Sequence, residues 1–239
     1  MNNLNIFCVT DKPVKYLEDL DINLVGVGER QFNKKYITCL SGKNIQKKEK
    51  HYSELTFHYW YWKNLLDLKS DNWVGFCQKR RFWCKNRNTN KEEITLHNIC
   101  QNIIVEPQDE WKDYEVILCD PININKVKKI KMLKRGFQSI IKKPSIFFDS
   151  KKQSIKFHFD MHHGYGNLKK AIDQLEKEDR SDFYDYVNLN TKFNPHIMYI
   201  SKNTILDKWF SLLFSWLKRC EKIFGIPFNA VFIAAQTNS

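Results

Sequence analysis

The sequence predicts an α/β fold in which one central mixed sheet, flanked by helices, forms a single domain. Short apolar runs rich in β-formers alternate with segments of helical period. The chain of 239 residues is 42% apolar and 14% aromatic, which suffices for a sizeable core. We find no internal repeat and no linker rich in proline, glycine or serine that would mark a domain boundary.

The first strands are predicted from apolar runs that end in turn residues. Residues 4–10, "LNIFCVT", form the first strand and are followed by "DKP". Residues 22–28, "INLVGVG", form the second, whose Gly26 and Gly28 suggest a dinucleotide fingerprint. Position 31 is Gln31 rather than a third glycine, so we discard that motif. The basic run "SGKNIQKKEKH" that follows is expected to be a solvated loop.

A helix is predicted to begin after Ser53 in the aromatic stretch "YSELTFHYWYWKN". Ser53 would cap this helix, and Glu54 would lie in its first turn, where a carboxylate suits the positive helix terminus. One apolar stripe at helical spacing is expected to face the core: Leu55, Tyr59, Trp62 and Leu66. Glu54, His58 and Tyr61 lie beside that stripe, so this part of the helix could border a pocket.

The alternation of strands and helices continues to the end of the chain. The further elements that we expect are strands at 72–78, 115–121 and 195–200 and helices at 166–187 and 205–224. The segment 124–136 is basic and irregularly amphipathic, and 145–159 is a pair of strands or an extended loop.

The most informative short motif is "QKRRFW", which follows the strand at 72–78. A helix leading into a strand that ends in polar residues is how an α/β sheet presents a ligand site at its carboxyl edge. Arg80 and Arg81 offer bidentate donors for a phosphate or carboxylate, and Phe82 and Trp83 could stack on a base or sugar. The alternative is surface charge beside core aromatics.

Few other motifs carry chemistry. "MHHGYG" places His162 and His163 beside a glycine loop, which suits proton transfer, phosphate contact or metal ligation. Adjacent histidines point apart in a strand or helix, so we do not expect them to share a metal. The sequence contains no HExxH, Walker loop, GxSxG or convincing DxD pair.

The formal charge of +12 invites a nucleic-acid interpretation. The 39 basic residues are 32 Lys and 7 Arg, scattered along the chain, which fits coding bias and surface solvation. A positive field would also attract nucleotide diphosphates or an anionic membrane surface, so charge alone does not decide which of these partners binds. We therefore do not expect nucleic acid as the partner.

The sequence gives no sign of export. "MNNLNIFCVT" lacks the basic and apolar regions of a signal peptide, and "WFSLLFSWL" at 209–217 is too short to cross a bilayer. The seven cysteines show no CxxC spacing, which suits reduced thiols. We expect a cytoplasmic protein. The helix at 205–224 would pack on the sheet, with peripheral contact with the inner membrane surface as the alternative.

Six segments together resemble a known family. In order, they are "VGVGERQFNKKYITCLSGKNI", "YSELTFHYWYWKN", "WVGFCQKRRFW", "YEVILCDP", "HHGYGNLKKAIDQL" and "FNPHIMYISKNTILDKWFSLLFSWLKRCEK". They resemble the DUF4422 family of capsular and exopolysaccharide glycosyltransferases over nearly the whole chain. The resemblance implies a GT-A-like nucleotide-sugar fold. It also implies transfer of a sugar, from a UDP donor, to a capsular, exopolysaccharide or lipopolysaccharide glycan on a lipid carrier.

The resemblance also assigns roles to residues. Arg80 and Arg81, with Lys79, would neutralise the diphosphate where many GT-A enzymes carry DxD. We therefore expect no cofactor, although Mn²⁺ or Mg²⁺ stays an alternative. Residues 1–120 would form the donor half and 121–239 the acceptor half. The substrate-binding residues would be Thr10, Lys12, His58, Tyr59, Trp62, Gln78, Lys79, Arg80, Arg81, His162, Asn194 and His196.

Two departures from the family pattern affect catalysis. Gln78 stands where the family has a histidine, and Asn229 and Ala230 stand where it has Glu and Arg. An amide cannot accept the proton of an acceptor hydroxyl. The general base would then lie elsewhere, with Glu54, Asp120 and His163 as candidates. Otherwise the protein is a catalytically impaired relative that binds sugar nucleotides or glycans. A basic nucleic-acid binder is the third reading.

Overall fold

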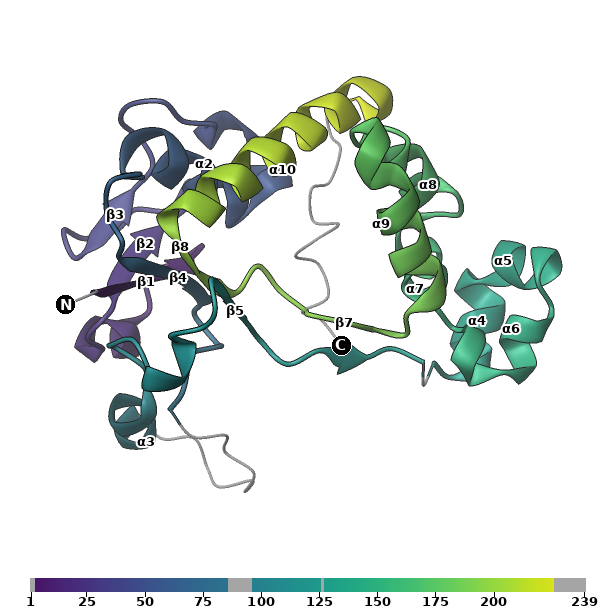
Figure 1. Ribbon diagram of the computed structural model, residues 1–239, viewed down its shortest axis with the longest axis horizontal. Coiled ribbons are helices and arrows are strands. Elements are labelled where there is room, and N and C mark those ends of the chain that lie inside the picture. The colour runs from purple at the N-terminus through teal and green to yellow at the C-terminus, as the bar shows by residue number, and fades with distance from the viewer. Residues whose placement is uncertain (1–2, 86–95, 126, 226–239) are drawn as a thin grey trace. The chain divides into compact units, whose positions relative to one another are not determined.

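The computed structural model describes residues 3–85, 96–125 and 127–225 (Figure 1). The chain divides into two compact units, which we describe separately. The first unit contains the chain up to Cys119 together with His196–Phe214, and the second contains Asp120–Pro195 and the continuation from Ser215. The predicted assignment of 1–120 to the donor and 121–239 to the acceptor stays a prediction.

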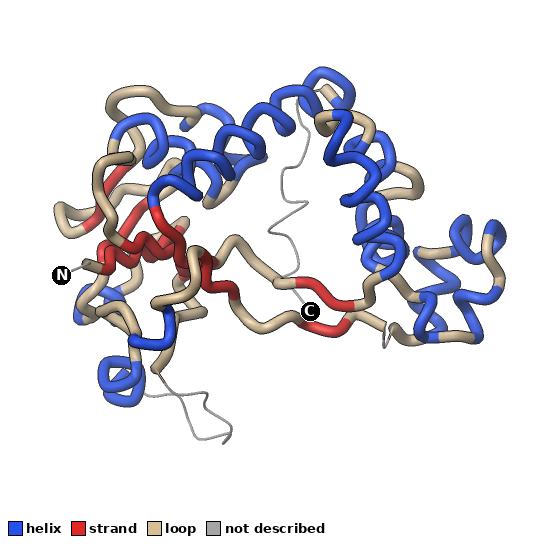
Figure 2. Tube along the Cα trace, in the orientation of Figure 1, coloured by secondary structure: helices blue, strands red, loops and turns tan. Residues whose placement is uncertain are grey.

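A six-stranded mixed sheet forms the centre of the first unit (Figure 2). Its strand order is β3-β2-β1-β4-β8-β5. The strands are β1 (Leu4–Thr10), β2 (Asn23–Gly26), β3 (Tyr36–Thr38), β4 (Trp73–Gln78), β5 (Val116–Leu118) and β8 (Tyr199–Lys202). β1 to β4 are mutually parallel, whereas β8 runs antiparallel to both β4 and β5. The predicted α/β fold with a mixed sheet flanked by helices is thus confirmed.

Both faces of this sheet are covered. The helices of the first unit are η1 (Lys15–Asp19), η2 (Gln46–Lys48), α1 (Glu49–Tyr52), α2 (Leu55–Asn64), α3 (Leu96–Asn102), η3 (Asp109–Trp111) and the first part of α10 (Asn203–Phe224). On one face, Phe76 of β4 meets aromatic rings of α2 and α10, Phe57 and Phe210 among them. On the other face, Ile6, Cys77 and Ile200 lie in a core cluster with Trp111. This double coverage explains why all six residues of β4 are buried.

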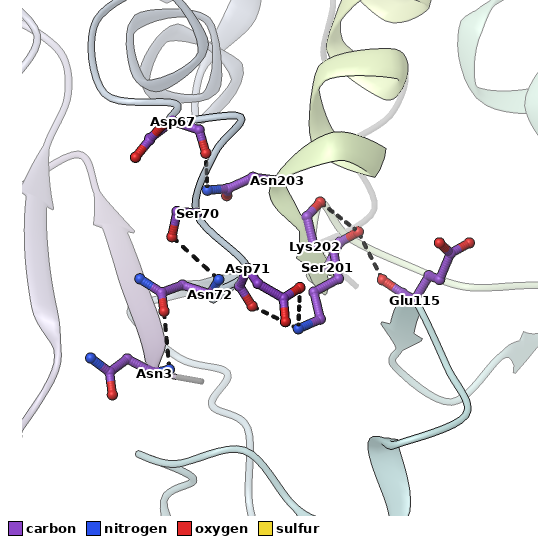
Figure 3. Close-up of polar contacts among 9 residues, drawn as sticks. All are labelled: Asn3, Asp67, Ser70, Asp71, Asn72, Glu115, Ser201, Lys202 and Asn203. Atoms are coloured by element: carbon purple, nitrogen blue, oxygen red, sulfur yellow. Dashed lines mark hydrogen bonds and ion pairs between the residues drawn. The ribbon is translucent and has the colours of Figure 1, made fainter. Parts of the chain in front are cut away.

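Polar contacts join the segments that precede β4 and β5 to β8 and the start of α10 (Figure 3). The Lys202 ammonium donates to the backbone carbonyl of Asp71 at 2.7 Å and pairs with its carboxylate at 3.0 Å. The Ser201 hydroxyl donates to the carbonyl of Glu115 at 3.1 Å, and the Asn203 amide donates to that of Asp67 at 2.8 Å. These bonds hold β8 and the start of α10 against those segments.

The second unit is mostly helical. Its elements are β6 (Ile122–Asn123), α4 (Lys129–Arg135), α5 (Phe137–Lys142), α6 (Ser145–Phe148), η4 (Ser150–Lys152), α7 (Ile155–His163), α8 (Asn167–Ile172), α9 (Lys177–Leu189), β7 (Lys192–Phe193) and the end of α10. Two small cores hold it together, one around Met132 and Phe157 and the other around Ile172 and Val187. The Trp216 indole of α10 donates to the carbonyl of Ala171 at 2.7 Å, which ties α10 to the second core.

The structure corrects several sequence expectations. Residues 145–159 form helices rather than strands or a loop, because Ser154 caps α7 by accepting from the N–H of Phe157 at 3.3 Å. The expected loop at 41–51 contains η2 and α1, and the expected helix at 166–187 is two helices. Within the described residues, no helix is both long and apolar enough to cross a membrane.

Candidate functional site

The carboxyl ends of four parallel strands meet at one edge of the sheet in the first unit. The register pairs Thr10 of β1 with Gly26 of β2, and Gly26 with Thr38 of β3. β1 also pairs with β4, which ends at Gln78. β8 is antiparallel to β4, so its amino end, which follows His196, comes to the same edge. Side chains beyond these strand ends therefore converge, as they do at the ligand sites of α/β sheets.

A tight turn at the end of β4 presents the two predicted arginines. The N–H of Arg81 donates to the carbonyl of Gln78 at 3.0 Å, and the N–H of Gln78 donates back at 3.2 Å. Lys79 and Arg80 therefore occupy the two central positions of the turn. The Tyr16 hydroxyl of η1 donates to the carbonyl of Lys79 and anchors the turn from the neighbouring loop. These hydrogen bonds hold the backbone of the turn, from which both arginine side chains extend.

The three cations of the turn differ in their partners. Lys79 forms an ion pair with Asp11, which follows β1. Burial acts to raise the pKa of Asp11, but the hydrogen bond and charge of Lys79 outweigh it and lower that pKa overall. Neither Arg80 nor Arg81 forms an ion pair with another described residue. Two guanidinium groups thus stay available for an anionic ligand.

Thr10 and Lys12 lie where β1 leaves the sheet. The Thr10 hydroxyl donates to the carbonyl of Lys12 at 2.7 Å and accepts from its N–H at 3.2 Å. The buried Thr10 therefore shapes the loop that carries Asp11, while the side chain of Lys12 is exposed. Both residues lie at the predicted edge, and their contact with substrate stays a prediction.

His196 faces the same edge from the segment before β8. Its backbone has a φ of 67°, in the left-handed region that non-glycine residues rarely adopt. Burial lowers the pKa of His196, and the nearby charge of Arg81 lowers it further. Its Nδ1 is buried and has no hydrogen-bond partner among the described residues. A histidine with a strained backbone and a lowered pKa, close to an arginine that pairs with no other described residue, is typical of a functional position.

A pocket opens at the ends of β2 and β3, which sequence reasoning missed. Its volume is about 860 Å³, a common size for small-molecule sites. A methyl group on Gly26 would lie 2.5 Å from ring carbons of Phe32, so this glycine lets the ring close over the strand. The pocket is lined by Gly26, Gly28, Glu29, Arg30, Gln31, Phe32, Thr38, Cys39, Leu40, Gln46, Lys47, Glu49 and Lys50.

Glu49 connects this pocket to the arginine turn. Burial raises its pKa, and three neighbouring carboxylates raise it further: Asp11, Glu29 and Glu54. Asp11 is also the ion-pair partner of Lys79, so its carboxylate interacts with both the pocket residue Glu49 and the turn residue Lys79. A carboxyl group with a raised pKa in a pocket is a candidate for ligand contact. The signal for this region was the Gly26 and Gly28 pair, which we discarded.

The α2 helix does not provide the pocket wall that the sequence suggested. His58 is fully buried: its Nδ1 meets the Tyr199 hydroxyl at 3.0 Å, and burial lowers its pKa to about 3. The half-buried Tyr59 and Trp62 pack against α10, where the Trp62 indole donates to Asp207 at 2.7 Å. These three predicted binding residues lie in the core and at a helix contact. Tyr61, also suggested for a pocket, is buried as well.

Glu54 lies at the start of α2, close to the pocket residue Glu49. Ser53 does not cap α2, because it ends α1 with a φ of 47° and Glu54 takes the cap position without a side-chain hydrogen bond. One carboxylate oxygen of Glu54 is buried without a hydrogen-bond partner in the described part of the chain. Glu54 is thus the candidate base that the first unit contributes.

Four predicted residues belong to the second unit: Asp120, His162, His163 and Asn194. His162 and His163 end α7, and burial lowers the pKa of each. The ring of His162 lies 4.7 Å from that of His158, and the ring of His163 lies 4.8 Å from that of Phe159. Their roles stay predictions.

The two aromatic residues of the "QKRRFW" motif, Phe82 and Trp83, belong to the core. Trp83 is buried, its indole donates to the carbonyl of Phe76 at 2.9 Å, and Phe82 packs on the same core. Both therefore support the turn from the core, which agrees with the alternative of surface charge beside core aromatics.

Asn229 and Ala230, which depart from the family pattern, lie outside the described residues. Among those described, no three or more His, Cys, Asp or Glu side chains group so that they could hold a metal ion.

A comparison with family models supports the family that the six sequence segments resemble. The model of a family described as a domain of unknown function, DUF4422, matches residues 5–229. This chain belongs to the DUF4422 family. No curated protein matches the sequence. Among solved structures, the apo structure of the WbbM bifunctional glycosyltransferase matches this DUF4422 chain with a TM-score of 0.64 and 19% identity. The match covers 92% of this chain and 37% of that one, so it shows a shared fold.

Proposed function

We propose that this protein is a glycosyltransferase that moves a sugar from a UDP-sugar donor to a capsular, exopolysaccharide or lipopolysaccharide glycan. The observation that carries the proposal is the pair of guanidinium groups on the anchored Gln78–Arg81 turn, which form no ion pair with other described residues. The same unit has a pocket of about 860 Å³ at the ends of β2 and β3. The fold shared with a protein titled as a bifunctional glycosyltransferase supports the same reaction class.

In this proposal the donor lies along the carboxyl edge of the sheet. The nucleoside occupies the pocket at the ends of β2 and β3, where Glu49 accepts hydrogen bonds from ribose hydroxyls. The diphosphate lies against Arg80 and Arg81, whose N–H groups bind its oxygens bidentately. As the sugar leaves, negative charge grows on the diphosphate, and the guanidinium groups that bind it stabilise this charge.

His196 and the carboxylates have separate parts in the reaction. His196, whose pKa is lowered by burial and by the nearby charge of Arg81, forms a hydrogen bond with the sugar. Glu54 is the base that we favour for the acceptor hydroxyl, because it lies in the same unit as the arginines and one of its buried oxygens has no hydrogen-bond partner among the described residues. Asp120 and His163 stay as alternatives, and Asn194 and His162 as acceptor contacts.

Thermal unfolding with added nucleotides tests the donor site. A ligand that binds only the folded state raises its stability, by about 2.7 kcal/mol at a concentration 100 times Kd. We expect UDP and UDP-sugars to raise Tm, and GDP and CMP to do so less. The Arg80→Ala/Arg81→Ala variant should bind UDP at least about tenfold more weakly, because each charged hydrogen bond contributes about 1.5–3 kcal/mol.

Three controls make this test decisive. Arg135→Ala removes an exposed arginine of the second unit and should keep the UDP response. The response should persist in EDTA, because guanidinium groups stand in for a metal; a response that requires Mn²⁺ would overturn metal independence. UDP release from a UDP-sugar in the presence of glycan acceptor distinguishes a transferase from a relative that only binds. No response to any nucleotide would overturn the donor site.

A further inference from the structure

The positive charge of the chain is concentrated in one segment of the second unit. Residues 128–152 contain nine basic residues and one acidic residue, Asp149, so this segment carries a net +8 of the chain's +12. All nine basic side chains are exposed. α4, α5, α6 and η4 make up most of the segment. This segment therefore holds eight of the 32 lysines with one acidic residue to balance them, and it accounts for most of the net charge.

The same helices expose large apolar side chains. Ile130, Leu133, Phe137 and Ile141 recur at helical spacings of three and four, with exposed fractions of 70%, 49%, 57% and 59%. Phe148 of α6 is 82% exposed. α4 and α5 are nearly continuous, because the N–H of Gly136 bonds to the carbonyl of Met132 and the carbonyl of Gly136 accepts from the N–H of Ile140. The stripe therefore runs along both helices.

These exposed side chains are not needed for the local core. The core beneath α4 to α7 consists of Met132, Ile146, Phe157 and Met161, with the partly buried Ile140 and Phe147 packed on it. The helices thus have one apolar face turned inward and a second one turned to solvent. A soluble surface gains nothing from exposing Phe148 or Ile130, so the second face points to a partner.

We infer that α4, α5 and α6 form a docking surface for an anionic lipid bilayer. Apolar side chains flanked by lysines are what a segment needs to lie in the interface of a membrane with negative headgroups. The charge complements the phosphates, and the bulky apolar groups reach the acyl region. A nucleic acid would explain the cations but would leave the exposed isoleucine and leucine side chains unused. The inference is independent of the proposed donor site.

Vesicle flotation of the purified full chain tests this surface. We expect binding to vesicles of phosphatidylcholine with 30% phosphatidylglycerol and little binding to phosphatidylcholine alone. Each basic residue near the surface contributes about fivefold in affinity. Lys142→Gln/Lys143→Gln should therefore bind on the order of 25-fold more weakly. Phe137→Ser/Phe148→Ser should also lose binding, although it keeps every charge.

Matched variants separate this surface from general charge and from α10. Lys170→Gln/Lys177→Gln removes two exposed lysines of the same unit and should float like the unmodified chain. Trp209→Ser/Leu212→Ser removes exposed apolar groups of α10, 45% and 52% exposed, and should also float normally. Circular dichroism and Tm confirm that each variant is folded.

Three results would overturn the inference. Equal binding to neutral and anionic vesicles would remove the role of charge. Loss of flotation in either control variant that matches the loss in the patch variants would remove the assignment to α4 to α6. Tight binding to a single-stranded RNA 30-mer that needs Lys142 and Lys143 but not Phe137 and Phe148, without flotation, would identify a nucleic-acid surface instead.

Discussion

The two arginines of the Gln78–Arg81 turn differ in one neighbour. Arg81 lies close enough to His196 to lower the pKa of that histidine, whereas the pKa of His196 carries no contribution from Arg80. A cation disfavours the imidazolium form, so removal of the cation must raise the pKa. Arg81 is thus the arginine whose orientation can be measured without a ligand.

Arg81→Ala should raise the pKa of His196 towards its ordinary value while leaving it depressed. Burial is the larger cause of the depression and persists in the variant. NMR titration of the His196 ring protons measures the change, and Arg80→Ala serves as the matched control. An unchanged His196 titration in Arg81→Ala would mean that this guanidinium group points elsewhere.

His58 should make folding stability depend on pH. Its folded pKa is about 3, below the ordinary value of 6.5, so between those values the unfolded state binds a proton that the folded state does not. The free energy of unfolding should therefore fall as pH falls from 6.5 towards 3, by up to about 1.4 kcal/mol per pH unit. Its stabilising contribution is fully present above pH 6.5.

His58→Asn isolates this contribution. Asparagine places a polar atom near the position of Nδ1 and can keep the hydrogen bond to Tyr199, but it does not titrate. We expect urea unfolding from pH 4 to pH 7 to give a curve with a shallower slope for the variant. Curves with equal slopes would show that His58 is not the group responsible.

Secondary-structure elements are predicted correctly where hydrophobic periodicity and residue composition indicate the same type of element. β1 has the predicted bounds, and the strand expected at 72–78 is β4, because both are short apolar runs that the sheet buries on two faces. α2 is a helix as the sequence predicts, but of the predicted stripe only Leu55 is fully buried. Both the sheet and α10 pack against α2, so its buried side chains, Phe57 and Trp60 among them, extend beyond a single stripe.

Short elements and pockets escaped prediction for a different reason. β3 has three residues, too few to show a period, and it exists because its backbone pairs with β2. The pocket depends on the close approach of Phe32 to Gly26 and on Gly28, whose φ is 93°. Both are tertiary features that single-residue patterns do not reveal. The arginine turn was predictable because strand end and charge coincide in sequence.

The packing of β4 between β1 and β8 predicts a coupled pair of substitutions. Gly75 pairs with Ile6 on one side and Ile200 on the other. A Cβ at position 75 would lie 2.5 Å from Cδ1 of Ile6 and 2.9 Å from Cγ1 of Ile200. Gly75→Ala should therefore destabilise the fold by about 1–3 kcal/mol through overpacking.

Ile6→Val removes the Cδ1 atom that the new methyl group meets. Alone it should cost about 0.5–1.5 kcal/mol, but combined with Gly75→Ala it should recover part of the loss. Chemical denaturation of the four proteins gives the coupling free energy. Simple additivity of the two costs would indicate that the strands separate to admit the methyl group instead of clashing.

Across the entire chain, the two proposals use different units. The arginine turn and the pocket belong to the first unit, and α4 to α6 belong to the second. The total charge of +12 could not separate them, because it sums a ligand site, a basic surface and ordinary solvated lysines. The distribution of exposed apolar groups among those charges is what distinguishes the basic surface from solvation.

A crossed experiment should therefore show two independent losses. Arg80→Ala/Arg81→Ala should lose the UDP response and still float with anionic vesicles, whereas Lys142→Gln/Lys143→Gln should float poorly and keep the full UDP response. Contributions of sites without shared partners add, so UDP should not change vesicle affinity in the unmodified chain. Thermal unfolding and flotation of all three proteins, each with and without UDP, measure this directly. A change in vesicle affinity on adding UDP would instead reveal coupling between the units, and reciprocity would require vesicles to change UDP affinity by the same factor.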